Sequence, residues 1–222
     1  MKLIKPSYKI ITPIDGREIL KLIEEIGRTC YKSEDNITED SAEKFVAKLI
    51  KSGHHSVIEH KSLSVRFIND RGISHEEVRH RLASFSQEST RYCNYSKDKF
   101  SNELTFIIPS WFKSDLVGRF EIIQGTEDPA ERNWMSAMLD AEQYYNTLIG
   151  YGWSPGQARS VLPNSLKTEI VVTANLREWR TIFQQRCASG AHEQMRELMH
   201  PLLAEMKSKI PVVFDDLYPE II

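Results

Sequence analysis

The chain has 222 residues, of which 41% are hydrophobic and 27% are charged, a balance typical of a folded globular protein. Its 29 Lys and Arg residues are offset by 31 Asp and Glu residues, and a net charge of −2 disfavours a general polyanion-binding protein. Three widely spaced cysteines predict free thiols and no disulfide framework. No segment has the apolar run of a signal peptide or a membrane span, so we expect a cytoplasmic protein without membrane contact.

The first helices are predicted by capping and spacing. Asp15 is placed to cap a helix that carries Leu20 and Ile23 at helical spacing and extends to about Cys30. A second helix is indicated by apolar residues at helical spacing within 45–50, and a glycine shortly afterwards provides its stop signal.

The next elements are shorter. Apolar and polar residues alternate over 63–67, which predicts a half-buried strand. Ser74 and Glu77 match a capping box, so we expect a helix to open at Ser74 and run toward Arg79. Residues 105–108 form a short apolar run that predicts a second strand.

The second half of the chain is richer in helix. The same signals predict a helix over 134–149, a helix start at Ser154-Pro155, a strand over 169–174, a helix capped by Asn175 and Glu178, and a helix over 195–206. Helical segments outnumber scattered strands. We therefore expect an α+β fold, a single domain over 1–222 with a modest, mostly antiparallel central sheet flanked by helices.

Several common site motifs are absent from the sequence. Gly150, Gly152 and Gly156 miss the G-x-G-x-x-G spacing by one residue and follow a helical pattern, so they indicate a turn. No phosphate-binding G-x-x-x-x-G-K-[ST] segment is present. One cluster has metal-ligand residue types and leaves a metal-dependent hydrolase open as an alternative: His54, His55, Glu59 and His60. Because it lacks a further helix-spaced ligand, we expect no metal.

Residues 79–92 concentrate positive charge. Arg79, His80, Arg81 and Arg91 are interleaved with hydroxyl and amide side chains and with apolar residues, so part of the segment must be buried. Guanidinium forks match phosphate oxygens in a bidentate manner, and a buried arginine cluster with few adjacent carboxylates predicts an anionic ligand. A nucleic-acid-binding module remains a second alternative, with Phe85, Tyr92 and Tyr95 as stacking partners.

The order of motifs resembles the flavin-dependent thymidylate synthase family. Arg79-His80-Arg81, followed after seven residues by Ser89, is similar to the signature of that family. Four further segments are similar to the family in the same order: Gly53-His54 with Glu59-His60, Ala158-Arg159 with Leu162-Pro163, Asn175-Leu176-Arg177, and Arg186. The resemblance extends from about Cys30 to His192, which is most of the chain.

The resemblance implies an activity, a cofactor and an assembly. The reaction is the reductive methylation of dUMP to dTMP, with 5,10-methylenetetrahydrofolate as carbon donor. FAD is the cofactor that supplies hydride, and NADPH reduces it again. Members of the family are homotetramers with their sites at subunit interfaces, so the resemblance implies the same assembly here. We expect no nucleic-acid partner.

The resemblance also implies roles for individual residues. Arg186 is expected to be catalytic, and His54 is expected to border the flavin and folate sites. The residues implied for dUMP are Glu76, Arg79, Gln87, Glu88, Ser89, Thr90, Arg91, Arg159 and Arg186. The residues implied for FAD are Ser56, Glu59, Arg79, His80, Arg81, Gln87, Asn175, Arg177 and Thr181. Three of these residues depart from the family pattern. At the position of Glu76 the family often has Gln, at that of Gln87 it commonly has Glu, and at that of Thr181 it has Asn.

Overall fold

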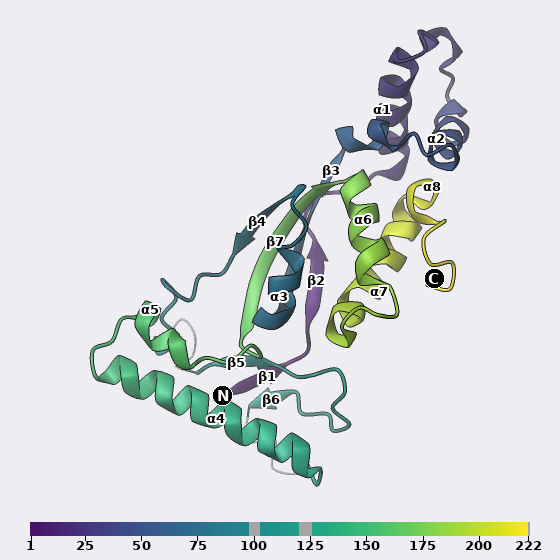
Figure 1. Cartoon of the computed structure of the whole chain (residues 1–222). Helices are drawn as coiled ribbons and strands as arrows, with labels where there is room; N and C mark the ends of the chain where they lie inside the picture. Colours follow the sequence, from purple (N-terminus) through teal and green to yellow (C-terminus); the bar gives the residue numbers. More distant parts are fainter. Residues whose placement is uncertain (98–102, 120–125, 222) are drawn as a thin grey trace. The chain divides into compact units, whose positions relative to one another are not determined.

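The computed structural model describes residues 1–97, 103–119 and 126–221 (Figure 1). It combines helices with two β-sheets, so the α+β prediction is confirmed. The chain divides into two compact units. Unit 1 comprises Met1–Ser7, Phe67–Arg79 and Ser86–Ile170, and unit 2 comprises Tyr8–Arg66, His80–Phe85 and Val171–Ile222.

The larger sheet has four antiparallel strands in the order β2-β3-β7-β4. Its members are β2 (Ser7–Ile10), β3 (Ser62–Asp70), β4 (Ala83–Gln87) and β7 (Lys167–Asn175). In β3, Leu63, Val65 and Phe67 are fully buried while the residues between them are more exposed, which confirms the alternating pattern read from the sequence. The predicted strand over 169–174 is confirmed within β7, whose residues also alternate between buried and partly exposed.

Unit 1 contains a second, three-stranded sheet covered by a long helix. Its strands are ordered β5-β1-β6, where β1 (Lys2–Ile4) pairs in parallel with β5 (Thr105–Ile107) and antiparallel with β6 (Gly118–Arg119). Figure 1 shows helix α4 (Pro129–Gly150) running alongside these strands. Leu3, Phe106 and Tyr145 are fully buried in one apolar cluster, so the helix and the sheet share a core. The predictions of a strand at 105–108 and a helix over 134–149 are confirmed.

The helix predicted from Ser74 begins earlier and ends earlier. Helix α3 spans Arg71–Glu77, and the side chain of Asp70 caps it by accepting a hydrogen bond from the Ile73 backbone N–H at 2.7 Å. Ser74 is buried within the helix, where its hydroxyl donates to the Arg71 carbonyl. The capping-box prediction was therefore wrong, because Asp70 supplies the cap before Ser74 is reached. The short helix α5 (Pro155–Ala158) does carry the predicted cap, with Ser154 and Gln157 forming a capping box.

Unit 2 is mainly helical. Its helices are α1 (Gly16–Thr29), α2 (Ser41–Lys51), α6 (Leu176–Arg186), α7 (Glu193–Lys209) and α8 (Pro211–Phe214), with short 3-10 helices at Glu34–Asn36 and η2 (His55–His60). Asp15 and Asn175 cap α1 and α6 as predicted, each accepting a hydrogen bond from a backbone N–H three residues later. Trp179, Phe183 and Phe214 form a buried aromatic chain that joins α6 to α8.

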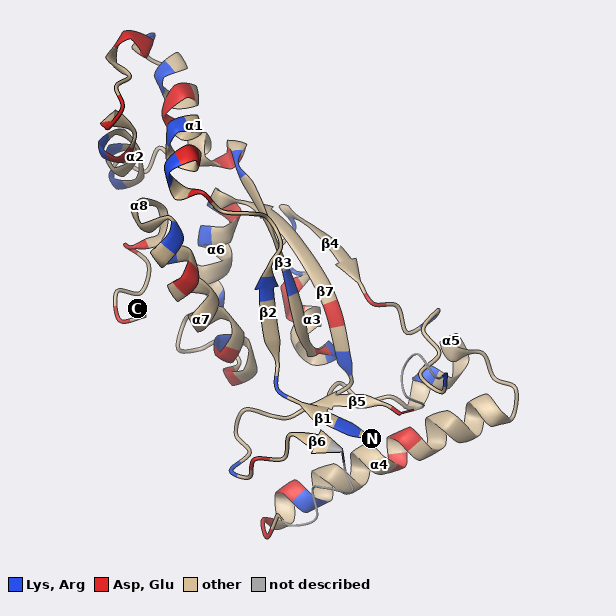
Figure 2. Cartoon of the chain, turned by 180° about the vertical axis from the view of Figure 1, so that it is seen from behind, with Lys and Arg blue, Asp and Glu red and all other residues tan. Residues whose placement is uncertain are grey.

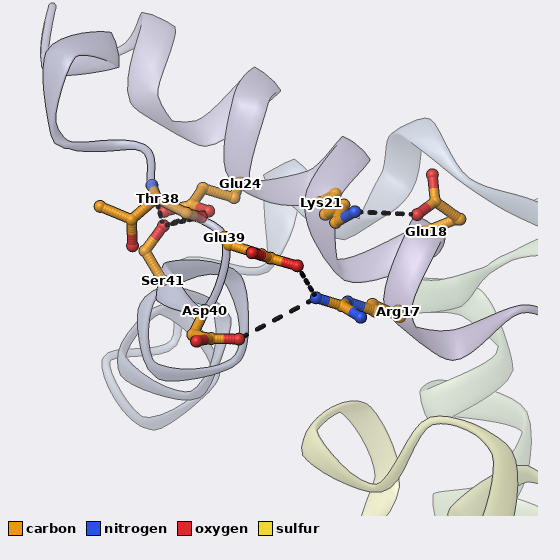
Figure 3. A network of polar contacts seen from close by, with 8 residues as sticks. All are labelled: Arg17, Glu18, Lys21, Glu24, Thr38, Glu39, Asp40 and Ser41. Carbon is orange, nitrogen blue, oxygen red and sulfur yellow. Dashed lines mark hydrogen bonds and ion pairs between the residues drawn. The ribbon is translucent and has the colours of Figure 1, made fainter.

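Polar contacts join α1 to the first residue of α2 and to the segment before it. Figure 2 shows charges of both signs along α1, and Figure 3 shows several of them from close by. Arg17 donates to Glu39 at 3.1 Å, and Ser41 donates to the buried carboxylate of Glu24 at 2.8 Å. The exposed Arg17 pair adds little to stability, whereas the Glu24 contact satisfies a buried charge and so fixes how the two helices meet.

Candidate functional site

The Arg79-His80-Arg81 segment lies in the turn between α3 and β4. The side chains of Arg79 and Arg81 are exposed, while His80 between them is only 5% exposed. Arg79 belongs to unit 1, and His80 and Arg81 belong to unit 2. The segment therefore presents two guanidiniums to solvent and turns one imidazole into the interior.

Within unit 2, His80 lies between two charged side chains of α6. The Nε of Arg186 donates a hydrogen bond to His80 Nε2 at 3.0 Å, and His80 Nδ1 lies 3.5 Å from Glu178 Oε1. Burial and the neighbouring Arg186 charge lower the pKa of His80 to about 4. At neutral pH the ring is uncharged, and because Nε2 accepts from Arg186, the ring hydrogen is on Nδ1.

The predicted flavin residues of η2 and α6 lie side by side in unit 2. Arg177 Nη1 is 2.6 Å from Glu59 Oε1, and both side chains are about half exposed. Thr181 uses its hydroxyl to donate to the Arg177 carbonyl within the helix. His54 Nδ1 lies 3.3 Å from the Tyr31 hydroxyl. The structure thus gathers these residues on the surface of one unit.

In unit 1, the predicted substrate residues at the end of β4 and just after it are anchored by partly buried polar contacts. Gln87 Nε2 donates to Ser74 at 2.8 Å and to Thr168 at 3.2 Å. The next side chain, Glu88, accepts from the Tyr95 hydroxyl at 2.8 Å. Burial, followed by the Glu88 charge, raises the pKa of Tyr95, so its hydroxyl stays protonated as a donor.

A lysine holds the other oxygen of Glu88. Lys167 Nζ lies 2.8 Å from Glu88 Oε2 and 2.8 Å from Glu169 Oε1. The Glu88 backbone N–H also donates to the Glu169 carbonyl at 2.8 Å. Both carboxylate oxygens of Glu88 therefore have partners within unit 1, so this side chain is held in place before a ligand binds.

The turn at Ser89–Arg91 packs against the segment around α5. Arg159 Nη1 donates to the buried hydroxyl of Thr90 at 3.1 Å, and the Arg91 backbone N–H donates to the Ser89 hydroxyl at 3.3 Å. A Cβ at Gly156 would lie 3.3 Å from the Arg91 side chain, so a glycine there permits the close approach. Four of the residues implied for dUMP thus come together in unit 1.

Three exposed arginines, Arg79, Arg81 and Arg91, fall within 13 residues of one another. Among residues 1–97, 103–119 and 126–221, no carboxylate forms an ion pair with Arg79, Arg81 or Arg91. By contrast, Arg180 forms a bidentate pair with Asp216 at 2.6 and 2.7 Å. Guanidiniums without a protein anion are suited to an anionic ligand.

The sequence left open a metal site in the His54–His60 region. In the part of the chain that the structure describes, no three His, Cys, Asp or Glu side chains are grouped so that they could hold a metal ion. His55 Nε2 instead lies 3.3 Å from the Ile50 carbonyl.

Every described helix is too short or too polar to cross a membrane.

A cavity of about 440 Å³ in unit 2 lies away from the predicted residues. It is lined by the start of α1, by residues 39–43 and by residues 209–212, with charges of both signs. None of the residues predicted for dUMP or FAD lines it.

The sequence matches the family described as thymidylate synthase complementing protein over residues 14–212. The chain belongs to this family. It is 31% identical over 208 residues to a flavin-dependent thymidylate synthase of Pyrococcus furiosus, with 93% of this chain and 78% of that protein covered. It is also 31% identical to a flavin-dependent thymidylate synthase of Geobacter sulfurreducens, with 86% and 79% covered.

A solved structure has the same fold. The UMP/dUMP methylase PolB from Streptomyces cacaoi, bound with 5-Br dUMP, superposes with a TM-score of 0.76 at 18% identity and covers 97% of this chain and 96% of that chain. The family resemblance read from the motifs is confirmed by the family match. Membership of the thymidylate synthase complementing protein family does not favour either alternative, the metal-dependent hydrolase or the nucleic-acid-binding module.

Sequence reasoning missed the residues that support the site. Glu178 was identified only as a helix-capping residue, yet its side chain faces His80. Lys167, Thr168 and Tyr95 were not connected with Gln87 and Glu88, although strand alternation in β7 places Lys167 and Glu169 on one face. No local motif marks such partners, because they are distant in sequence from the residues they hold.

Proposed function

We propose that this protein is a flavin-dependent thymidylate synthase that methylates dUMP to dTMP, with 5,10-methylenetetrahydrofolate as carbon donor and NADPH as reductant of FAD. The observation that carries the proposal is the cluster of three exposed arginines, Arg79, Arg81 and Arg91, within the segment 79–91 that contains the R-H-R…S motif, in a chain that belongs to the family. The relatives in Pyrococcus and Geobacter bear that name.

The donor set of unit 2 fits a flavin dinucleotide. Arg81 is an exposed cation suited to pyrophosphate oxygens, and Arg177 is half exposed beside Glu59. Ser56, Asn175 and Thr181 add hydroxyl and amide groups that donate and accept. When bound, FAD supplies the hydride of the reaction. We assign its binding to Ser56, Glu59, Arg79, His80, Arg81, Gln87, Asn175, Arg177 and Thr181, with His54 bordering the flavin and the folate.

The donor set of unit 1 fits a nucleotide monophosphate. Arg91 is exposed, and Ser89, Thr90 and Arg159 meet in one turn around it. Gln87 and Glu88 hold that turn to the protein through Ser74, Tyr95 and Lys167. We assign dUMP binding to this set together with Glu76, Arg79 and Arg186, with Ser89 and Arg91 near the phosphate and sugar.

Arg186 is the proposed catalytic residue. When uracil C5 becomes nucleophilic, negative charge develops on N3 and the carbonyl oxygens, and a guanidinium that stays charged at all working pH values stabilises it. Burial raises the pKa of the adjacent Cys187 thiol to about 12, so this cysteine is not a thiolate nucleophile at neutral pH. Ser89 is assigned to substrate placement only.

The proposal extends to assembly and location. We propose a homotetramer in the cytoplasm with shared sites, acting as one functional domain over 1–222, without nucleic-acid or membrane partners. A single chain of 222 residues that must hold FAD, folate and dUMP makes shared sites reasonable. Light scattering of the purified protein tests the tetramer directly.

The test of function begins with the purified chain. We expect a yellow protein with flavin absorbance that forms dTMP from dUMP when methylenetetrahydrofolate and NADPH are supplied. Arg81→Ala should release FAD on dialysis while the circular dichroism spectrum is unchanged, because Arg81 is exposed and makes no ion pair among the described residues. A colourless protein that binds no added FAD and forms no dTMP would contradict the proposal.

A further inference from the structure

The buried imidazole of His80 connects a carboxylate to the proposed catalytic guanidinium. Arg186 Nε donates to His80 Nε2 at 3.0 Å, and Glu178 Oε1 lies 3.5 Å from His80 Nδ1. His80 is 5% exposed and Glu178 is 7% exposed, and all three residues belong to unit 2. We propose that Glu178 and His80 are positioning residues that fix the plane of the Arg186 guanidinium for the uracil ring. This inference rests on the function proposed above.

The hydrogen-bond donors fit only one arrangement. Arginine donates at every nitrogen, so His80 Nε2 must be the acceptor and Nδ1 must carry the ring hydrogen. The Glu178 carboxylate lies 3.5 Å from Nδ1, and its negative charge favours the tautomer that carries the hydrogen there. Protonation of His80 at Nε2 would place its N–H against the Arg186 Nε–H and an imidazolium beside the guanidinium. This agrees with a His80 pKa that burial and Arg186 lower to about 4.

A contact at Nε is well placed to orient the guanidinium. Recognition of two neighbouring acceptors by an arginine fork depends on the plane of the group. Holding Nε through a hydrogen bond limits rotation about the terminal torsion, which sets the direction of the paired Nη donors. His80 thereby determines which way Arg186 presents its charge.

Helix α6 supplies a rigid support for both ends of the arrangement. Glu178 lies in its first turn and Arg186 is its last residue. Between them, Trp179 and Phe183 are fully buried, and Trp179 also donates to the Leu63 carbonyl at 3.1 Å. The helix therefore holds Glu178 and Arg186 at a fixed separation along its axis. The imidazole between their side chains orients the guanidinium and transfers no proton.

The test compares two substitutions of Glu178 in the FAD-loaded enzyme. Glu178→Leu removes the carboxylate beside Nδ1, whereas Glu178→Gln keeps a polar oxygen at the same place. We expect Glu178→Leu to slow single-turnover dTMP formation by about 10- to 100-fold, the cost of a small misplacement of a catalytic group. Glu178→Gln should recover most of the rate. Calorimetry should show that both variants still bind dUMP and retain FAD.

A double-mutant cycle separates positioning from packing. In an Arg186→Ala background there is no guanidinium to orient, so Glu178→Leu should have almost no further effect on the rate. An equal slowing in both backgrounds, or a Glu178→Leu enzyme with the wild-type rate, would overturn the inference. Wild-type protein that binds FAD but forms no dTMP would instead overturn the proposed function.

The unaltered protein provides a second test that does not depend on activity or on the folding of a variant. Nitrogen-15 NMR at pH 7 should show His80 protonated at Nδ1 and unprotonated at Nε2. It should also show the Arg186 Nε–H protected from exchange with water. His80 protonated at Nε2 at this pH excludes the hydrogen bond from Arg186 and overturns the inference.

Discussion

Two groups of proposed ligand-binding residues are supported in opposite ways. In unit 1, the side chains of Gln87, Glu88 and Thr90 each bond to another side chain of the same unit, with distances of 2.8 to 3.2 Å. In unit 2, Arg81 is exposed and Arg177 is about half exposed beside Glu59. Thus the proposed nucleotide residues are built into the fold, whereas most proposed flavin residues lie at its surface.

The two sets of side chains are kept in place by different means. Side chains that are hydrogen-bonded in a partly buried network lose little further conformational entropy when a ligand arrives, so the unit 1 set is preorganised. Exposed guanidiniums keep rotamer freedom and become ordered when an anion binds. Arg186 is the exception in unit 2, because it is half-buried and bonded to His80.

Substitution of Arg186 is expected to have the largest effect on the rate of dTMP formation. Arg186→Ala should slow single-turnover dTMP formation by about 10²–10³-fold, the usual cost of removing one preorganised donor from a developing charge. Arg186→Lys keeps the charge but loses the planar fork, so it should recover only part of the rate. FAD occupancy should persist in both variants. If Arg186→Ala reacts at the wild-type rate with pre-reduced FAD and saturating dUMP, Arg159 becomes the next candidate.

The next effect concerns the buried imidazole of unit 2. The pKa of His80 is about 4 in the folded protein, against 6.5 for the free side chain. As the pH falls below 6.5, His80 becomes protonated in the unfolded chain but stays neutral in the folded protein. The free energy of unfolding therefore decreases between pH 6.5 and 4. The His80 share of that loss is about 3 kcal/mol. Urea unfolding across this range should have a shallower pH dependence in His80→Gln than in wild type; identical slopes would show that His80 titrates normally.

A smaller effect is expected from the network of unit 1. Lys167→Met removes the cation that lies 2.8 Å from the largely buried Glu88 carboxylate and leaves its hydrogen bond from Tyr95 in place. We expect a loss of about 2 kcal/mol in the free energy of unfolding, typical of a hydrogen bond to a charged group. The measurement is urea denaturation at pH 7, and Lys167→Arg serves as the charge-preserving control. If Lys167→Met lowers the free energy of unfolding no more than Arg177→Ala of unit 2 does, the proposed difference between the two sets of side chains is contradicted.

The smallest effect on stability is expected from Arg177→Ala in unit 2. Its pair with Glu59 is about half exposed on both sides, and exposed ion pairs contribute about 1 kcal/mol or less. FAD retention should fall more than stability does, because the proposed role of Arg177 is with the ligand. Dialysis followed by flavin absorbance measures retention, and thermal unfolding of the FAD-free protein measures stability. Unchanged retention with a large stability loss would reverse the interpretation.

Local signals in the sequence determined much of the secondary structure. Asp15 and Asn175 cap α1 and α6 as expected, because an N-cap bond joins residues three apart and needs nothing from the rest of the chain. Burial alternation in β3 followed from the period of a strand. Strand β4 was missed because its five residues lie between charged residues of the arginine segment, although Ala83 and Phe85 alternate with two exposed serines.

The family could also be predicted from the sequence, because the R-H-R…S signature and its companion motifs keep their order and spacing along the chain. The side chains that support these motifs became known from the folded structure. His80 meets Arg186 across 106 positions and Lys167 meets Glu88 across 79. Such pairs depend on how β4, β7 and α6 pack, and packing arises from the burial of apolar residues throughout each unit, which no single segment encodes.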